Sequence, residues 1–235
     1  MTRTLVTGAN RGLGYETARQ LIAAGHTVYV GARDPNRGRQ AAERIGARFV
    51  EIDVTSDASV TAAAIAVEAF GGLDVLINNA GIAGRTPEGG FATAAEETAD
   101  SLRTSFETNV FGVVRVIRAF LPLLEKSSTP VIVNVSSGLS LTRDLVRGDS
   151  PTYLYPGIGY PASKAALNVI TVQYAKAFPG IRINAVGPGF TATDLNGHTG
   201  TQSTQEGAEI IVRMAQISRE GPSGGFFDVR GTIVW

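Results

Sequence analysis

The amino-acid sequence predicts an α/β protein with a doubly wound parallel sheet and helices on both faces. Short apolar runs rich in Val and Ile alternate with amphipathic stretches along the whole chain, a pattern typical of repeated strand–helix units. The runs are almost continuously apolar, and strands of that kind are buried on both faces. No linker, repeat or low-complexity tract interrupts residues 1–235, so we expect a single domain.

The elements follow one another in a regular order. Apolar runs predict strands at residues 4–7, 27–31, 48–52, 73–77, 131–135 and 182–186. Apolar residues at helical spacing predict helices at residues 13–24, 36–45, 59–70, 96–124, 163–177 and 205–217, and the stretch 96–124 is long enough for one helix or two. Two Gly- and Pro-containing loops, at about 138–159 and 187–202, follow strands at the edge where open α/β sheets bind ligands.

Composition excludes several classes of function. The 21 Lys and Arg balance the 21 Asp and Glu, so no overall charge attracts nucleic acid or an anionic membrane, and we expect neither partner. Without cysteine, the chain has no disulfide, thiolate ligand or Cys nucleophile. His26 and His198 have no acidic partner at ligand spacing, so we expect no metal site.

Targeting signals are also missing from the pattern. The N-terminus reaches a strand-like run within a few residues and lacks the features of a signal peptide. No apolar run approaches the roughly 18 residues of a membrane-spanning helix. We therefore expect a cytoplasmic protein.

A glycine-rich turn joins the first strand to the first helix. Residues 7–14 read Thr-Gly-Ala-Asn-Arg-Gly-Leu-Gly. Glycines allow the backbone to approach a pyrophosphate closely, and the helix N-terminus supplies free N–H donors. A tight strand–helix turn with no ligand is the alternative, but the position directly after the first strand favours dinucleotide binding.

The spacing of this turn resembles the TGxxxGxG fingerprint of the classical short-chain dehydrogenase/reductase family. Further motifs of that family follow in the same order: Asn78-Asn79-Ala80-Gly81, Asn109 in a helix, Asn134-Val135-Ser136-Ser137, Tyr160-Pro161-Ala162-Ser163-Lys164, and Asn184 to Gly189 with Thr191 and Thr193 after it. The resemblance covers essentially the whole chain. It implies a single-domain Rossmann fold and an oxidoreductase, with the carbonyl reductases as the most similar group.

The resemblance implies four catalytic residues, Asn109, Ser137, Tyr160 and Lys164. Tyr160 would protonate the developing alkoxide, Ser137 would hold the carbonyl oxygen, and Asn109 would maintain a water relay to Lys164. Tyr160 is the only tyrosine with a lysine four residues on, and residues i and i+4 share a helix face. The Lys164 ammonium is therefore expected to lower the pKa of the phenol.

Two features qualify the placement of these residues. Pro161 biases Tyr160 away from the helical region, while proline itself suits the first helical position, so the helix is expected to begin at Tyr160. Ser136 and Ser137 are adjacent and would point to opposite sides of the strand end. Ser137 is chosen on the resemblance alone.

Cofactor preference is expected at the end of the second strand. Ala32 stands where the family's NAD-type acid would be, Arg33 follows it, and Arg11 lies in the glycine turn. This arrangement predicts NADP(H), because arginine pairs with the additional phosphate. In the alternative, Asp34 holds the ribose of NAD(H), while Arg33 and Arg11 are solvated.

The full cofactor-binding set is implied by the resemblance. It comprises Gly8, Asn10, Arg11, Gly12, Leu13, Gly14, Arg33, Asp53, Val54, Asn79, Ala80, Gly81, Tyr160, Lys164, Pro188, Gly189, Thr191 and Thr193. Lys164 would bind the hydroxyls of the nicotinamide ribose. Asp53 would contact the adenine, although an Asp at a strand end is equally typical of a turn.

The predicted activity is an NADPH-dependent oxidoreductase that transfers hydride between nicotinamide and a small carbonyl or alcohol. Leu139, Tyr153, Tyr155 and Phe190 are the candidate substrate contacts. The alternative is a non-catalytic NADP(H)-binding regulator, but such proteins usually lose the tyrosine or lysine that remain here.

Assembly is expected to involve two helices. The family usually pairs through helices that correspond here to residues 110–124 and 163–177, which predicts a homodimer or homotetramer. In the alternative, the loop at 138–159 covers these helices.

Overall fold

A computed structural model describes residues 1–86 and 89–235, and its framework is one eight-stranded sheet in the order β3-β2-β1-β4-β5-β6-β7-β8. The strands are β1 (Arg3–Thr7), β2 (Thr27–Ala32), β3 (Arg48–Glu51), β4 (Val75–Asn78), β5 (Val131–Val135), β6 (Arg182–Val186), β7 (Phe226–Asp228) and β8 (Gly231–Ile233). The strands β1 to β7 are parallel. The expected doubly wound α/β fold is confirmed, and all six predicted strands are present.

The edge of the sheet differs from the sequence expectation. The two short strands β7 and β8 were not predicted, and β8 runs antiparallel to β7, so the sheet is not wholly parallel. Each of them has only three residues, too few to show a clear period in the sequence.

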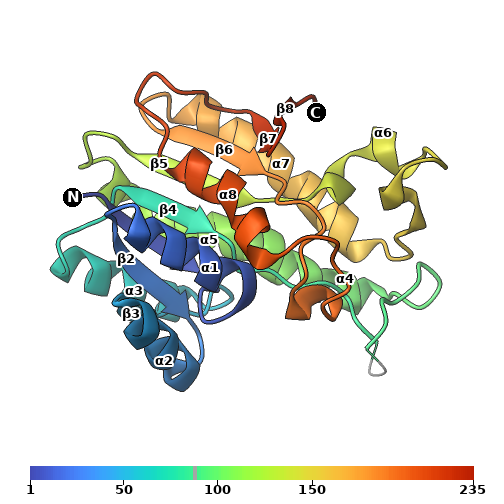
Figure 1. The fold of residues 1–235 in the computed structure, drawn as a ribbon, viewed down its shortest axis with the longest axis horizontal. Helices are drawn as coiled ribbons and strands as arrows, with labels where there is room; N and C mark the ends of the chain where they lie inside the picture. Colours follow the sequence, from blue (N-terminus) through green and yellow to red (C-terminus); the bar gives the residue numbers. More distant parts are fainter. Residues whose placement is uncertain (87–88) are drawn as a thin grey trace.

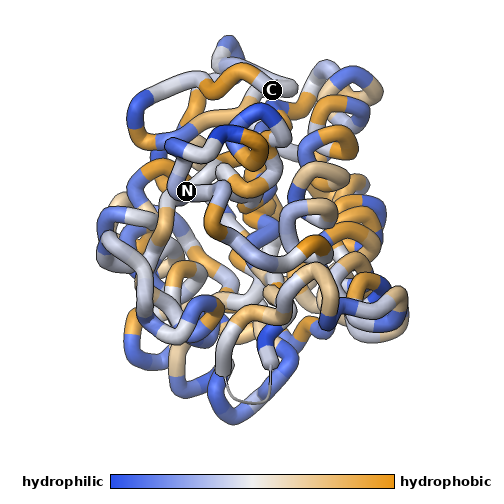
Figure 2. The backbone as a smooth tube through the Cα atoms, turned by 90° about the vertical axis from the view of Figure 1, so that its right-hand side faces the viewer, coloured by the Kyte–Doolittle hydropathy of each residue, from blue (hydrophilic) through white to orange (hydrophobic). Residues whose placement is uncertain are grey.

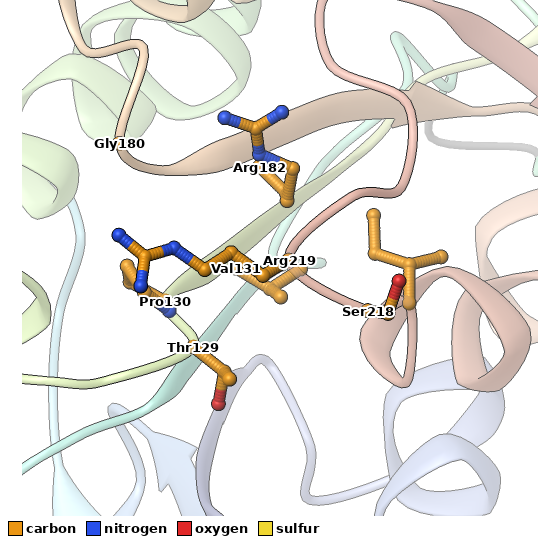
Figure 3. A pocket seen from close by; sticks show the side chains of 8 residues that line it. Thr129, Pro130, Val131, Gly180, Arg182, Ser218 and Arg219 are labelled. Atoms are coloured by element: carbon orange, nitrogen blue, oxygen red, sulfur yellow. The ribbon is translucent and has the colours of Figure 1, made fainter.

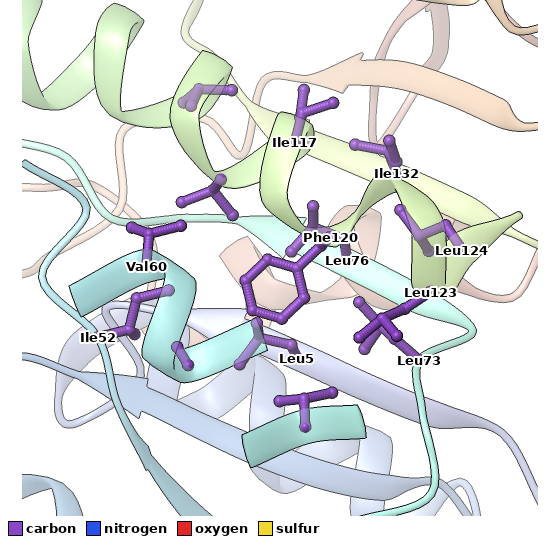
Figure 4. Packing of buried hydrophobic residues seen from close by; sticks show 14 of the residues in the cluster. Leu5, Ile52, Val60, Leu73, Leu76, Ile117, Phe120, Leu123, Leu124 and Ile132 are labelled. Carbon is purple, nitrogen blue, oxygen red and sulfur yellow. The ribbon is translucent and has the colours of Figure 1, made fainter. Parts of the chain in front are cut away.

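Six long helices cover the two faces of the sheet (Figure 1). They are α1 (Gly12–Ala23), α2 (Pro35–Ile45), α3 (Asp57–Ala69), α5 (Gly112–Leu124), α7 (Gly159–Ala177) and α8 (Thr204–Ala215). One apolar cluster unites the sheet with α1, α2 and α8, and the other unites it with α3, α5 and α7. Figure 4 shows Phe120 of α5 at the centre of the second cluster, with Leu5, Leu76 and Ile132 around it.

The hydropathy of the backbone follows this layering. Figure 2 shows hydrophilic residues concentrated in the outer turns and hydrophobic residues along the strand and helix runs. No helix in the described ranges is both long enough and apolar enough to cross a membrane.

The predicted helical stretch 96–124 is one continuous helical run with an irregular middle. It consists of α4 (Ala99–Phe106), a π-helix at Glu107–Phe111 and then α5. The predicted loop 138–159 contains a 3-10 turn at Gly138–Ser140, the short helix α6 (Thr142–Leu145) and another 3-10 turn at Pro151–Leu154. Loops of this kind carry function when they stand beyond the carboxyl ends of strands.

The strand order reverses beside β1, because β1 pairs with β2 on one side and with β4 on the other. At such a reversal, the connections from the two strands leave on opposite faces and open a crevice at the carboxyl ends. The glycine-rich turn after β1 and the segment after β4 meet at this point, which therefore positions the candidate site.

Candidate active site

The glycine-rich turn depends on the lack of side chains at Gly8, Gly12 and Gly14. Gly8 has φ of 66° and Gly12 has φ of 55°, in the left-handed region that favours glycine. A Cβ at Gly8 would lie 2.9 Å from the Cα of Ala80. A Cβ at Gly14 would collide with Asn79 Nδ2 and with the carbonyl oxygen of Gly8. The turn after β1 is thus packed directly on the Asn79-Ala80 segment after β4.

Asn79 holds this turn in place. Its Nδ2 donates to the carbonyl oxygen of Thr7 at 2.8 Å, and its backbone N donates to Thr7 Oγ1 at 3.0 Å. The Asn79 side chain, predicted to bind cofactor, is therefore engaged with the protein backbone. Ala80 and Gly81, the next two residues of the Asn-Asn-Ala-Gly motif, are half-buried.

Tyr160, Lys164 and Ser137 come together where β5 ends and α7 begins. Tyr160 and Lys164 are buried, with 9% and 4% exposure, and Lys164 Nζ lies 5.6 Å from the centroid of the Tyr160 ring. Lys164 Nζ also donates to the carbonyl oxygen of Val135 at 2.7 Å. The helix begins at Gly159, one residue before the predicted start, and Tyr160 is helical despite the proline that follows it.

The expected lowering of the Tyr160 pKa is not found. Burial raises the pKa of Tyr160 to about 12, and the neighbouring Ser137 hydroxyl acts in the opposite direction without cancelling it. Burial also lowers the pKa of Lys164 to about 8. The expectation was wrong for this state of the site because desolvation disfavours both charged forms.

The two adjacent serines have different surroundings. Ser136 is buried, and its hydroxyl donates to Asn168 Oδ1 at 2.6 Å, within the interface between β5 and α7. Ser137 is less buried, begins the 3-10 turn after β5, and acts on the Tyr160 phenol. Ser137, and not Ser136, is therefore the serine beside Tyr160.

Asn109 lies in the π-helix and is fully buried. Its Oδ1 accepts from the backbone N of Ile82 at 2.9 Å, and its Nδ2 donates to the carbonyl oxygen of Ile82 at 2.9 Å and to Ser163 Oγ at 3.0 Å. A Cβ at Gly81 would lie 3.3 Å from Asn109 Oδ1 and 3.6 Å from Lys164 Nζ. Asn109 and Lys164 therefore converge on Gly81.

The residues after β2 separate the two cofactor alternatives. The Asp34 carboxylate caps α2 by accepting from the backbone N of Asn36 at 3.0 Å and of Arg37 at 3.1 Å. Both bonds go to Oδ1, and Arg37 Nε lies 3.4 Å from Oδ2, so this carboxylate is engaged at the start of α2. Ala32 is buried and Arg33 is exposed.

Beside this strand end, a surface groove runs between the glycine turn and α2. It is lined by Asn10, Arg11, Tyr15, Arg37, Gln40, Ala41 and Arg44. Arg37 and Arg44 were missed by sequence reasoning because nothing in their spacing distinguishes them from solvated helix residues. With Arg11 they place three guanidinium groups along the groove, and Arg37 Nε lies 3.4 Å from Asp34 Oδ2.

Asp53 and Val54 are held by the protein itself. The Asp53 carboxylate accepts from the backbone N of Thr55 at 2.9 Å and from its hydroxyl at 2.7 Å. Burial raises the pKa of Asp53, but these bonds and the charge of Arg33 outweigh burial and lower it. The two bonds from Thr55 are typical of a turn, the adenine contact of Asp53 stays a prediction, and the side chain of Val54 belongs to the core.

The loop after β6 folds back over the glycine turn. Thr191 is buried, and its hydroxyl accepts from Gln202 Nε2 at 2.8 Å, while Thr193 begins a 3-10 turn at Asp194–Asn196. Gly189 has φ of 81°, and Pro188 is buried. A Cβ at Gly12 would lie 3.6 Å from Thr193 Cγ2, so the loop and the turn are in contact.

One expectation about histidine was wrong. His198 Nε2 lies 2.9 Å from Asp194 Oδ1, so this histidine does have an acidic partner, four residues away. His26 Nδ1 instead lies 2.8 Å from Thr4 Oγ1. Within residues 1–86 and 89–235, no group of three or more His, Asp or Glu side chains is arranged to hold a metal ion.

The four predicted substrate contacts are not equivalent. Tyr155 lies between Phe91 and Tyr160, with ring centroids 5.0 Å and 6.2 Å away. Tyr153 and Phe190 are exposed, and Leu139 is half-buried beside Ser137. Tyr155 thus lies directly against the Tyr160 ring.

A separate hollow lies at the opposite end of the strands, away from the candidate site. Figure 3 shows Arg182 and Arg219 beside it, at the amino ends of β5 and β6. Ser137 and Tyr160 stand at the carboxyl ends, so this hollow is not part of the candidate site.

Residues 2–204 match the short chain dehydrogenase family. This chain belongs to that family. It is 35% identical to (+)-neomenthol dehydrogenase from Arabidopsis thaliana over 285 aligned positions, which cover 95% of this chain and 94% of the relative.

Solved structures of the family agree with the fold. NADPH-bound carbonyl reductase from chicken fatty liver is 30% identical with a TM-score of 0.86, and the match covers 100% of this chain and 99% of that one. Salutaridine reductase from Papaver somniferum is 29% identical with a TM-score of 0.84, and the match covers 97% of this chain and 100% of that one. These relatives are oxidoreductases, and so is this chain, which favours a catalyst over the regulator that the sequence left as an alternative.

The alignment with the Arabidopsis enzyme also reveals a difference in length. It extends over 285 positions, whereas this short-chain dehydrogenase has 235 residues. The relative therefore carries segments that this chain lacks.

Proposed function

We propose that this chain reduces a small ketone or aldehyde with NADPH and oxidises the corresponding alcohol in the reverse direction. The observation that carries the proposal is the convergence of Ser137, Tyr160, Lys164 and Asn109 beside the glycine-rich turn. The names of the relatives, a dehydrogenase of neomenthol and a carbonyl reductase, support the substrate class.

The residues present fit a dinucleotide. Side chains are missing at Gly8 and Gly12, where the backbone is left-handed, and the helix α1 begins there with free N–H groups. The arginines of the groove between the glycine turn and α2 would hold the additional phosphate of NADPH, together with the exposed Arg33 after β2. When bound, the cofactor supplies the hydride.

The protein's own residues would manage the proton and the substrate oxygen. Burial keeps the Tyr160 phenol protonated, so its hydroxyl is ready to donate to the carbonyl oxygen as negative charge develops there. The Ser137 hydroxyl would donate to the same oxygen and hold it in place. Lys164 and Asn109, which meet at Gly81, would supply positive charge and order water behind the tyrosine.

Replacing Tyr160 by phenylalanine tests the proposal. Tyr160→Phe removes the proton and keeps the ring, so carbonyl reduction should fall by about 10² to 10⁴-fold while NADPH binding persists. Tyr174→Phe is the matched control, since Tyr174 is in the same helix and stacks on Phe178 with centroids 6.1 Å apart. NADPH oxidation, followed by absorbance, measures the turnover of both variants. Normal turnover in Tyr160→Phe would reject the mechanism.

We also propose that the chain forms a homodimer or homotetramer through α5 and α7. Phe111, just before α5, is 50% exposed and Val169 of α7 is 62% exposed, which supports an apolar contact there. Other apolar residues of these helices, such as Ile117 and Phe120, are already buried in the core. Light scattering measures the mass in solution. A mass of 24.6 kDa rejects the proposal, and two or four times that mass supports it.

A further inference from the structure

The start of α7 presents a local conflict that its own sequence does not resolve. Tyr160 precedes Pro161, and a residue before proline is biased away from the helical region. The residue before the helix, Ile158, provides no side-chain cap. Pro161 lacks an N–H, so it cannot contribute a donor to the first turn. Tyr160 is nevertheless helical and buried, so contacts from outside α7 must fix the backbone at this point.

Glu97 supplies that contact from the segment before α4. Its Oε2 accepts from the backbone N of Ile158 at 3.1 Å and from the backbone N of Gly159 at 2.6 Å. These are the two residues directly before Tyr160. A carboxylate at a helix N-terminus satisfies free N–H groups and is favoured by the helix dipole. Charge-assisted hydrogen bonds of this length are among the stronger ones in proteins.

Three glycines make room for this carboxylate. A Cβ at Gly84 would lie 2.9 Å from Glu97 Oε1, a Cβ at Gly157 would lie 3.1 Å from the same atom, and a Cβ at Gly159 would lie 3.2 Å from Oε2. The glycines come from the segment after β4 and from the approach to α7. Glu97 thus stands in a closely fitted space between two segments that border the candidate site.

The same space adjoins the aromatic residues of the site. A Cβ at Gly157 would lie 3.3 Å from Cε1 of Tyr155, whose ring lies against Tyr160. The backbone N of Ala94 donates to the carbonyl oxygen of Pro156 at 2.9 Å, which fixes the Glu97 segment to the chain before α7. A displacement of Glu97 would therefore be transmitted to both tyrosines.

We propose that Glu97 is a positioning residue, which holds the first turn of α7 so that the Tyr160 hydroxyl stands beside Ser137 and Lys164. The role is geometric: Glu97 acts through the backbone of residues 158 and 159 and does not itself exchange a proton. This inference rests on the proposed function, because it assumes that the placement of Tyr160 limits carbonyl reduction.

Variants of Glu97 and its neighbour test the role in the full chain. Glu97→Ala removes both hydrogen bonds, and kcat for carbonyl reduction should fall about 10- to 100-fold, the scale of a small misplacement of a reacting group. The dissociation constant for NADPH, measured by fluorescence, should not change. Glu97→Gln keeps an acceptor oxygen at the same position and should restore kcat to within about threefold of the wild type.

Glu96→Ala is the matched control. Glu96 is also a carboxylate of this segment, but it accepts from the backbone N of Thr93 at 2.8 Å and from the Thr93 hydroxyl at 2.9 Å, without reaching α7. Its removal should leave kcat unchanged. Equal losses of kcat in Glu96→Ala and Glu97→Ala would overturn the inference, because the effect would then belong to the loop as a whole.

The test also covers a Glu97→Ala variant that does not fold and a failure of the proposed function itself. If Glu97→Ala does not fold, Glu97→Asp takes its place, because the shorter side chain cannot hold the backbone N of Ile158 and Gly159 at the same distances. A kcat well below that of Glu97→Gln then supports the role, and equal kcat in the two variants overturns it. Tyr160→Phe separates this inference from the proposed function. If that variant loses turnover while Glu97→Ala keeps it, only the inference fails; if Tyr160→Phe keeps turnover, the proposed function fails first.

Discussion

Arg11 of the glycine-rich turn and Asp194 of the loop after β6 form an ion pair, with Arg11 Nη1 3.0 Å from Asp194 Oδ2. The loop is also held from the other side, since Arg85 Nη1 donates to the carbonyl oxygen of Asp194 at 3.2 Å. The arginine that we propose for the cofactor phosphate is thus already partnered by a carboxylate of the covering loop. Phosphate binding at Arg11 must compete with this ion pair.

Removing the competing charge should therefore favour NADPH. We expect Asp194→Asn to lower the KM for NADPH by at most about fivefold, because exposed ion pairs contribute little. The KM for NADH should change less, since NADH lacks the phosphate. Steady-state kinetics with both cofactors measures the effect. Asp228→Asn, which disrupts the remote pair with Arg230, is the control. A higher KM for NADPH in Asp194→Asn would show that the ion pair assists binding.

Arg33 provides a second test of cofactor preference. Arg33→Asp replaces a cation at the end of β2 by an anion and should raise the KM for NADPH much more than the KM for NADH. Arg39→Asp is the control for the change of charge, because the Arg39 guanidinium lies over the Phe49 ring, 5.5 Å from its centroid. Equal changes for both cofactors would show that Arg33 does not recognise the phosphate.

The buried lysine predicts the pH dependence of reduction. Burial lowers the pKa of Lys164 to about 8, so the ammonium is present below this pH and is lost as the pH rises through it. Tyr160, with a pKa of about 12, stays protonated over the same range. We expect kcat/KM for NADPH, which reports on the free enzyme, to be constant below about pH 8 and to fall above it.

A substitution of Lys164 distinguishes its effect on the pH profile from the effects of other titrating groups. Lys164→Arg keeps a permanent positive charge and should abolish the fall above pH 8, whatever its effect on the absolute rate. A fall with the same midpoint in Lys164→Arg would assign the titration to another group.

Asp74 predicts how stability depends on pH. Burial raises its pKa, but hydrogen bonds from Arg3 and Ser127 outweigh burial and lower it to about 2 from the ordinary value of 3.8. A lowered pKa stabilises the fold above the unfolded-state value, and this contribution is lost as the pH falls from about 4 to 2.

Urea unfolding of Asp74→Asn measures this contribution. The variant should be less stable than the wild type by about 1–2 kcal/mol at pH 7, and the difference should shrink towards pH 2. Asp100→Asn, which affects an exposed pair with Arg103, should show no such convergence. A constant difference across the whole pH range would refute the assignment.

Local patterns were sufficient to predict most of the fold. The strand at 131–135 and the strand at 182–186 have the predicted limits, because their apolar runs end abruptly at Ser and Gly. Gly8 and Gly12 could be recognised from the glycine spacing directly after the first strand, and their left-handed backbone angles favour glycine. The grouping of Ser137, Tyr160 and Lys164 follows from motifs at the ends of adjacent elements, and their catalytic roles stay predictions.

Contacts between distant segments could not be predicted in the same way. Glu97 is 62 residues from Gly159, and nothing in its local pattern distinguishes it from the neighbouring Glu96. Arg85 and Asp194 meet only because two loops fold over the same strand ends. The pKa of Tyr160 was predicted wrongly because sequence spacing shows a neighbouring charge but does not show desolvation.

The π-helix at Glu107–Phe111 accommodates one residue more than an α turn at the same place in the helical run. The extra residue here is part of what brings Asn109 to Ile82. Deleting one residue of this turn would let it close as an ordinary α turn, which would remove the local widening that carries Asn109. Protein engineers who regularise this helix to raise thermal stability should therefore expect Asn109 to shift relative to the Ile82 backbone that it now bonds.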